Sequence, residues 1–157
     1  MIQTSQSLAE YSKRNHEFKI AIVKSLYHQD LTNSLEQACR KHLIASGVRE
    51  KNIITFEVPG SWEIPIVAKN LAEVKKFDGI VAFGIIIKGE TYHFEILAEE
   101  CARALMNIAL ESNIPVIFEI LTTYNLEQAR KRSMGKYNKG KEGAFALLKT
   151  IKTLSKS

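Results

Sequence analysis

The sequence has little cysteine and no pattern of metal ligands. Its 157 residues include two cysteines, Cys39 and Cys101, and both lie on apolar faces of predicted helices. Two such cysteines indicate buried free thiols in a reducing cytoplasm rather than a disulfide framework. No cluster of cysteine and histidine has metal-ligand spacing, so we expect no metal site.

Long apolar runs and several common sequence motifs are also absent. No run approaches the roughly 20 apolar residues that span a membrane. The first 19 residues contain no apolar core of a secretory signal. We therefore expect a cytoplasmic protein without a membrane partner. The chain has no GxxxxGKS/T loop, no GxGxxG after a strand and no GxSxG elbow. These absences argue against nucleoside triphosphate, dinucleotide and hydrolase functions.

What the sequence does have is the composition of one globular domain, with 45% hydrophobic and 25% charged residues. Residues 1–17 are polar without a lasting period and predict an N-terminal arm, and 18–157 predict a single domain. The net charge is +5, and much of the excess lies in 130–141. Such a basic cluster suits a phosphate ligand as well as a nucleic-acid backbone.

Apolar patterns along the chain alternate between strands and helices. The capping-box pairs Asn33 with Glu36 and Asn125 with Gln128, and the stop at Gly47, predict helix ends. The alternation predicts an α/β fold, a three-layer α/β/α sandwich with a four-stranded parallel sheet. The predicted strands cover 18–26, 53–58, 77–87 and 114–121, and the predicted helices cover 32–46, a segment opening at 62–63, 92–112, 126–133 and 142–154.

Residues 84–95, GIIIKGETYHFE, join a buried strand, a glycine turn and a helix start. The first turn of a helix offers unpaired N–H groups and a positive dipole end, which together favour an anion. His93 lies in that first turn and is suited to proton transfer near neutral pH. The alternative is that Gly89 is a turn residue only and His93 a half-exposed surface histidine.

Other candidate site residues fall in loops at the carboxyl ends of the predicted strands, where open α/β sheets bind ligands. Trp62, after the turn at 59–61, covers a planar ring or is a core tryptophan. Tyr27 stacks on a heterocycle or anchors its loop. Arg132, Lys136 and Lys139 bind a phosphate or form a solvated basic face.

Four segments together resemble the lumazine synthase family. They are VPGSWEIP at 58–65, GIIIKGETYHFE at 84–95, IPVIFEILTT at 114–123 and the LEQARKR…NKG series at 126–140. The resemblance implies a flavodoxin-like fold without a metal or redox cofactor. It also implies the penultimate reaction of riboflavin biosynthesis. That reaction condenses 5-amino-6-(D-ribitylamino)uracil with 3,4-dihydroxy-2-butanone 4-phosphate to 6,7-dimethyl-8-ribityllumazine, releasing water and phosphate.

The resemblance also implies a role for each matching position. His93 transfers protons, Tyr27 stacks on the pyrimidine, and Arg132 binds the phosphate. The remaining substrate contacts fall on Ser61, Trp62 and Glu63 for the ring and ribityl chain, on Ile85, Ile86 and Ile87 for the ring, on Glu90 and Thr91 for the phosphate, on Phe118 from a neighbouring subunit, and on Lys139 near the phosphate.

The family's oligomers and this chain's departures from the family set further expectations. Family members form pentamers that stand alone, pair as decamers or close into shells of sixty subunits, with Phe118 and Arg132 positions supplied by the neighbour. The loop at 136–140 is one residue shorter than the common pattern, which leaves the higher assembly open. Tyr27 replaces the usual Phe or Trp, and Ile85 stands where small or polar residues are frequent.

Two other functions compete with the enzyme. A carrier of flavin or lumazine, or a shell-forming protein, would share the fold, but it needs neither the phosphate grip of Arg132 nor the proton carrier His93. A nucleic-acid-binding module using 130–141 ranks last, because no aromatic platform for single strands lies beside the basic loop.

Overall fold

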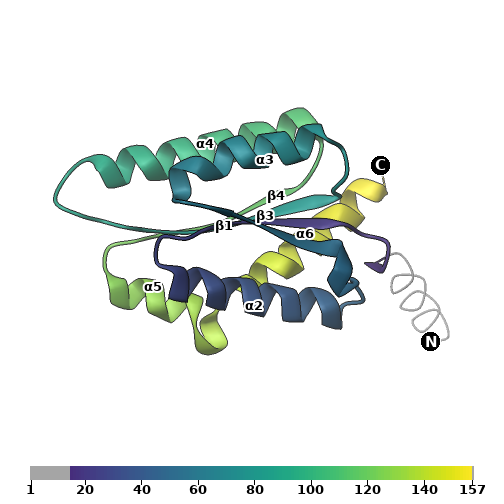
Figure 1. Cartoon of the computed structure of the whole chain (residues 1–157), viewed down its shortest axis with the longest axis horizontal. Helices are drawn as coiled ribbons and strands as arrows, with labels where there is room; N and C mark the ends of the chain where they lie inside the picture. The colour runs from purple at the N-terminus through teal and green to yellow at the C-terminus, as the bar shows by residue number, and fades with distance from the viewer. Residues whose placement is uncertain (1–14, 157) are drawn as a thin grey trace.

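The computed structural model describes residues 15–156, in which a sheet lies between two layers of helices (Figure 1). The four strands pair in parallel in the order β2-β1-β3-β4. This confirms the predicted α/β class and the four-stranded parallel sheet. The strands are β1 (Ile20–Ser25), β2 (Ile53–Val58), β3 (Gly79–Ile87) and β4 (Val116–Thr123).

The helices divide between the two faces of the sheet. In Figure 1, α3 and α4 lie above the sheet, and α2, α5 and α6 lie below it. The α-helices are α2 (Gln29–Ala45), α3 (Ile64–Glu73), α4 (His93–Ser112), α5 (Leu126–Ser133) and α6 (Lys139–Ser155), and the short 3₁₀ turns are η1 (Glu50–Asn52), η2 (Ser61–Glu63) and η3 (Gly135–Tyr137). Within residues 15–156, every helix is too short or too polar to span a lipid bilayer.

The central strands are buried on both faces, which explains their continuous apolar runs. All six residues of β1 are buried. Ile20 and Ile22 pack into the core under α2 and α6, whereas Ala21 and Val23 pack into the core under α3 and α4. Because the strands are parallel, their carboxyl ends meet at one edge, which carries the loops before α2, η2, α4 and α5.

Helix α2 begins at Gln29, three residues before the predicted start at 32. The predicted capping box of Asn33 and Glu36 is wrong, because both side chains bind Lys24 instead, each at 2.6 Å from Nζ. His28 precedes the helix in the left-handed region, with φ 56°. The predicted stop at Gly47 is confirmed by its φ of 104°.

The predicted cap of α5 is half correct. Asn125 Oδ1 accepts a hydrogen bond from the Gln128 N–H at 2.8 Å, as a cap requires. The Gln128 side chain, however, accepts from the Tyr124 N–H at 2.9 Å rather than from Asn125. Helix α6 begins at Lys139 and not at 142, because Asn138 Oδ1 accepts from the Gly140 N–H at 2.8 Å and starts the helix earlier.

Most of the predicted arm, residues 1–14, lies outside the described residues. The next two residues contact the domain. Asn15 Nδ2 donates to the Ser46 carbonyl at 2.6 Å, and the His16 carbonyl accepts from Asn52 Nδ2 at 3.1 Å. Cys39 and Cys101 are free and buried, as predicted. Burial raises the pKa of the Cys39 thiol to about 12 and that of Cys101 to about 11.

Candidate active site

A pocket of about 350 Å³ opens at the carboxyl edge of the sheet, between η2, the end of β3 and the start of α4. We call it the ring pocket. It brings together most of the predicted site residues, and Glu90 lies exposed in the same loop as Gly89. The predicted residues that line it are Tyr27, Ser61, Trp62, Glu63, Ile85, Ile86, Ile87, Thr91 and His93.

The turn at η2 is held tightly against β3. A Cβ on Gly84 would lie 2.5 Å from Ser61 Oγ, so glycine at that position permits the close approach. Cys101 Sγ on α4 donates to the Ser61 carbonyl at 3.3 Å, and Glu63 Oε2 accepts from the Gly60 N–H at 3.0 Å. Pro65 lies in the first turn of α3, where a proline is tolerated. These contacts fix the backbone that carries Ser61, Trp62 and Glu63.

Two aromatic rings of the ring pocket, those of Trp62 and Tyr27, face solvent. Trp62 is 60% exposed and Tyr27 is 67% exposed. The Tyr27 ring contacts the neighbouring His28 ring edge to face, with centroids 4.6 Å apart. The alternative of a core tryptophan is therefore wrong. Both rings offer apolar faces to a planar ligand.

His93 is the first residue of α4 and is exposed on the wall of the ring pocket. No side chain caps this helix start, which leaves the N–H groups of its first turn facing outward. The Lys88 N–H donates to the Thr123 carbonyl at 2.8 Å, and Lys88 Nζ pairs with Glu95 Oε1 at 3.3 Å. These contacts fix the loop before α4, so that the helix start and its histidine face the pocket together.

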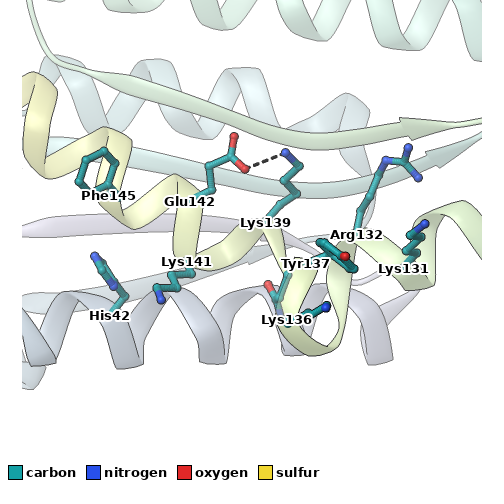
Figure 2. Close-up of a pocket in the computed structure, with 10 residues that line it drawn as sticks. His42, Lys131, Arg132, Lys136, Tyr137, Lys139, Lys141, Glu142 and Phe145 are labelled. Atoms are coloured by element: carbon teal, nitrogen blue, oxygen red, sulfur yellow. Dashed lines mark hydrogen bonds and ion pairs between the residues drawn. The ribbon is translucent and has the colours of Figure 1, made fainter.

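Arg132 and Lys139 lie in a separate groove of about 510 Å³ between α2, α5, η3 and α6 (Figure 2). We call it the basic groove. Arg132 Nη1 donates to the Gln128 carbonyl at 3.1 Å, and Lys139 Nζ pairs with Glu142 Oε2 at 2.7 Å. Figure 2 shows Arg132 and Lys139 extending in the same direction from α5 and α6. The residues that line the basic groove are His42, Lys131, Arg132, Lys136, Tyr137, Asn138, Lys139, Lys141, Glu142 and Phe145.

Phe118 belongs to neither cavity. It lies on the edge strand β4, on the face covered by α3 and α4, because its alternate neighbours Val116 and Ile120 pack there. Its ring is 39% exposed. Within one chain, the structure therefore places Phe118, Arg132 and Lys139 apart from the ring pocket.

Sequence reasoning missed two apolar residues of the ring pocket. Phe94 and Leu97 line the pocket, although neither is among the predicted site residues. Leu97 lies four residues after His93 and so shares its helix face. The four-residue spacing from His93 could therefore have identified Leu97 as a pocket residue.

Comparison with known proteins identifies the family. The profile of the 6,7-dimethyl-8-ribityllumazine synthase family matches residues 17–155. The chain belongs to the lumazine synthase family. A lumazine synthase from a Polaromonas species is 43% identical over 128 residues, covering 82% of this chain and 81% of the relative. Lumazine synthases from Albidiferax ferrireducens and Leuconostoc mesenteroides are 41% and 42% identical, over 88% and 85% of this chain and 87% and 86% of their own length.

Membership of the lumazine synthase family makes the chain a transferase of riboflavin biosynthesis. Of the four matching segments, 58–65 and 84–95 supply most of the ring pocket, and 126–140 supplies part of the basic groove. The family match spans residues 17–155 and therefore does not rest on a single motif.

Proposed function

We propose that the ring pocket is where this chain condenses 5-amino-6-(D-ribitylamino)uracil with 3,4-dihydroxy-2-butanone 4-phosphate to 6,7-dimethyl-8-ribityllumazine. The observation that carries the proposal is the meeting of Tyr27, Trp62 and His93 around one cavity. Flat aromatic faces suit the uracil ring, and a histidine at an uncapped helix start suits proton transfer beside a phosphate.

The uracil substrate lies between Tyr27 and the end of β3. Its ring stacks on Tyr27 and contacts the backbone of Ile85, Ile86 and Ile87. Its ribityl chain follows the turn at η2, where the fixed backbone of Ser61 and the Glu63 carboxylate provide polar contacts. Stacking supplies area, while the few polar groups set the orientation of the ligand.

The butanone phosphate lies at the start of α4. The outward N–H groups beside Glu90 and Thr91 bind its phosphate, and the helix dipole favours the negative charge. The cation that this phosphate needs is Arg132, whose guanidinium can bind two phosphate oxygens at once. Because Arg132 is held in the basic groove of its own chain, it is supplied by an adjacent copy.

The shared site makes the working protein a homo-oligomer, and we propose a pentamer. Phe118, exposed on the edge strand β4, completes the ring pocket of the neighbour. The exposed apolar side chains of Ile96, Met106 and Leu110 on α4 are consistent with a helix that packs against another copy. The free thiols of Cys39 and Cys101 fit the predicted cytoplasmic location.

The residue types fit the chemistry of the condensation. The 5-amino group of the uracil attacks the ketone and forms an imine, with loss of water. Phosphate then leaves by elimination, and the resulting enol becomes a ketone. The second amine attacks this ketone and closes the ring with loss of a second water. His93 moves the protons, a role worth ~10²–10⁴-fold in rate. Arg132 and the α4 amides stabilise the departing phosphate, and binding both substrates together removes the entropy cost of their meeting.

Steady-state kinetics with both substrates, followed by lumazine absorbance, test the assignments. We expect His93→Ala to lower kcat by about 10²–10⁴-fold with little change in KM, because proton transfer is lost. We expect Arg132→Ala to raise KM for the butanone phosphate most strongly. No lumazine from the unchanged protein, together with tight flavin binding, would instead identify a carrier.

Mixed oligomers test whether the site is shared. His93→Ala and Arg132→Ala chains with different tags are co-expressed, and oligomers carrying both tags are purified. If each site takes His93 from one chain and Arg132 from the next, about one quarter of sites are complete in a random mixture. Activity then rises well above that of either variant alone. Two homo-oligomers mixed without exchange are the control. Activity no higher than this control would place both residues in one chain.

A further inference from the structure

Glu119 is a carboxylate in the middle of the edge strand β4, on the face that packs against α6. Its alternate neighbours Ile117 and Leu121 belong to the core on that face. Gly143 of α6 leaves the room that its side chain occupies. A Cβ on Gly143 would lie 3.0 Å from Glu119 Cγ and 3.5 Å from its Oε1. The Glu119 carboxyl group therefore lies between β4 and α6, next to Gly143, which has no side chain.

Glu119 interacts electrostatically with Lys139, one of the cations of the basic groove. Lys139 lies four residues before Gly143 and thus on the same face of α6. Its ammonium group is bound by Glu142 at 2.7 Å. Lys139 interacts electrostatically with Glu142, Glu119 and Arg132, and Glu119 interacts with Glu142 and Lys139. These four side chains form one charge cluster, which joins β4, α5 and α6.

The net charge of this cluster changes with the protonation of Glu119. Arg132 and Lys139 each carry a positive charge and Glu142 a negative one. With Glu119 protonated, the cluster has one surplus positive charge, and with Glu119 ionised it has none. An incoming phosphate is attracted more strongly in the first case.

We propose that Glu119 is a positioning residue for the phosphate half of the active site, because its protonation decides whether Arg132 and Lys139 present a surplus positive charge. This inference rests on the proposed function. Glu119 touches no substrate, and it acts through Lys139 and Arg132. The protonated form favours phosphate binding, and phosphate binding in turn favours the protonated form.

The surroundings of Glu119 allow this change near neutral pH. Burial, followed by the Glu142 carboxylate, raises the pKa of Glu119 to about 7, and Lys139 acts in the opposite direction. On α2, Cys39 interacts electrostatically with Glu119, and burial raises the pKa of Cys39 to about 12, so that thiol stays neutral. Its partner on β3 is the apolar Phe83. Ionisation of Glu119 therefore increases as pH rises through about 7, and phosphate affinity falls over the same interval.

The test compares the intact oligomer with Glu119→Gln, which has the same shape and no charge at any pH. We expect KM for the butanone phosphate to rise about three- to tenfold between about pH 6 and pH 8 in the unchanged protein, while kcat follows the same profile in both proteins. In Glu119→Gln this rise is absent. Identical KM profiles in the two proteins would overturn the inference.

Binding of inorganic phosphate separates this inference from the proposed reaction. Calorimetry in buffers of different ionisation enthalpy measures proton uptake on phosphate binding at about pH 7.5. The ionisation of phosphate itself contributes equally in both proteins, so we expect the unchanged protein to take up more protons on binding than Glu119→Gln does, and we expect Arg132→Ala to lose binding. This result stands even if no lumazine forms. Equal uptake with and without Glu119 would refute the role of Glu119 while leaving the reaction intact. Glu119→Met, which matches the apolar Ile117 and Leu121, repeats the test if Glu119→Gln fails to fold.

Discussion

Among substitutions of charged residues, we expect Lys24→Met to lower the free energy of unfolding most. Lys24 lies on β1 and is only 5% exposed. Its ammonium group is 2.6 Å from Asn33 Oδ1, 2.6 Å from Glu36 Oε2 and 3.6 Å from Glu57 Oε2. These contacts connect β1 to α2 and to the edge strand β2. Removing the ammonium leaves a largely buried Glu36 carboxylate with fewer partners.

The magnitude follows from what remains around Glu36. Breaking a buried ion pair by removing one partner costs about 3–5 kcal/mol. Glu36 Oε1 still accepts from Thr55 Oγ1 at 2.6 Å and Arg40 Nε at 3.0 Å, so we expect the lower end, about 3 kcal/mol. For a domain of this size that corresponds to a Tm lower by roughly 6–12 °C.

The same network determines how stability depends on pH. Burial raises the pKa of Glu36, but hydrogen bonds from Lys24, Thr55 and Arg40 outweigh burial and hold its pKa below the ordinary value. This contribution to stability is present above the pKa of the unfolded chain and is lost as pH falls through the lower, folded pKa. Without Lys24, fewer hydrogen bonds oppose the effect of burial, so the pKa of Glu36 is higher. The acid-induced loss of stability therefore begins at a higher pH.

Urea unfolding at fixed protein concentration, at about pH 7 and about pH 4.5, measures both effects. The double variant Lys24→Met/Glu36→Leu removes both charges and should regain most of the lost stability. Lys69→Met is the surface control, because its pair with Glu73 is exposed and worth about 1 kcal/mol at most. The reasoning fails if Lys24→Met matches this control, or if the double variant is no more stable than the single one.

Two further predictions concern packing. In Gly140→Ala, the new Cβ would collide with the Leu35 backbone carbonyl, so we expect a loss of about 1–3 kcal/mol or more in urea unfolding, with a raised KM because Lys139 moves. Gly89→Ala is its control, since that Cβ meets open space, and equal stability of the two variants would contradict the packing argument. With pKa values of about 12 and 11, Cys39 and Cys101 should react with a thiol reagent at about pH 8 only after urea unfolds the chain. Rapid reaction of either thiol in the folded protein would show that it is accessible.

The sequence predicts the central strands well because β1 and β3 are buried on both faces and are largely apolar. Helix starts were predicted less well, since polar side chains that look like caps can have tertiary partners. Asn33 and Glu36 form a capping pattern but bind Lys24 across the β1–α2 contact. Asn138 starts α6 and also donates to the Ser133 and Ser34 carbonyls, and the predicted start at 142 shows that neither role was apparent from the sequence.

The candidate site was predictable only where the order of strands and helices brings its residues to one edge of the sheet. Tyr27, the turn at η2 and His93 lie in loops that the parallel topology brings to one edge, so their meeting follows from the order of strands and helices. The role of Glu119 depends on space left by Gly143 of α6, 24 positions along the chain, which no pattern within β4 indicates. Arg132 belongs to a matching segment, but its separation from His93 within one chain is a property of the fold alone.

On the proposed function, the division between the ring pocket and the basic groove makes catalysis depend on assembly. The ring pocket has a proton carrier and stacking rings, while the nearest cation in its loop, Lys88, is paired with Glu95. The basic groove has the cations Arg132 and Lys139, but their strength as a phosphate site depends on Glu142 and Glu119. On the proposed function, a chain that folds but does not assemble keeps His93 in place and lacks the arginine for its phosphate. Binding of the butanone phosphate then depends on two charge states, those of the substrate and of Glu119 in the neighbouring copy.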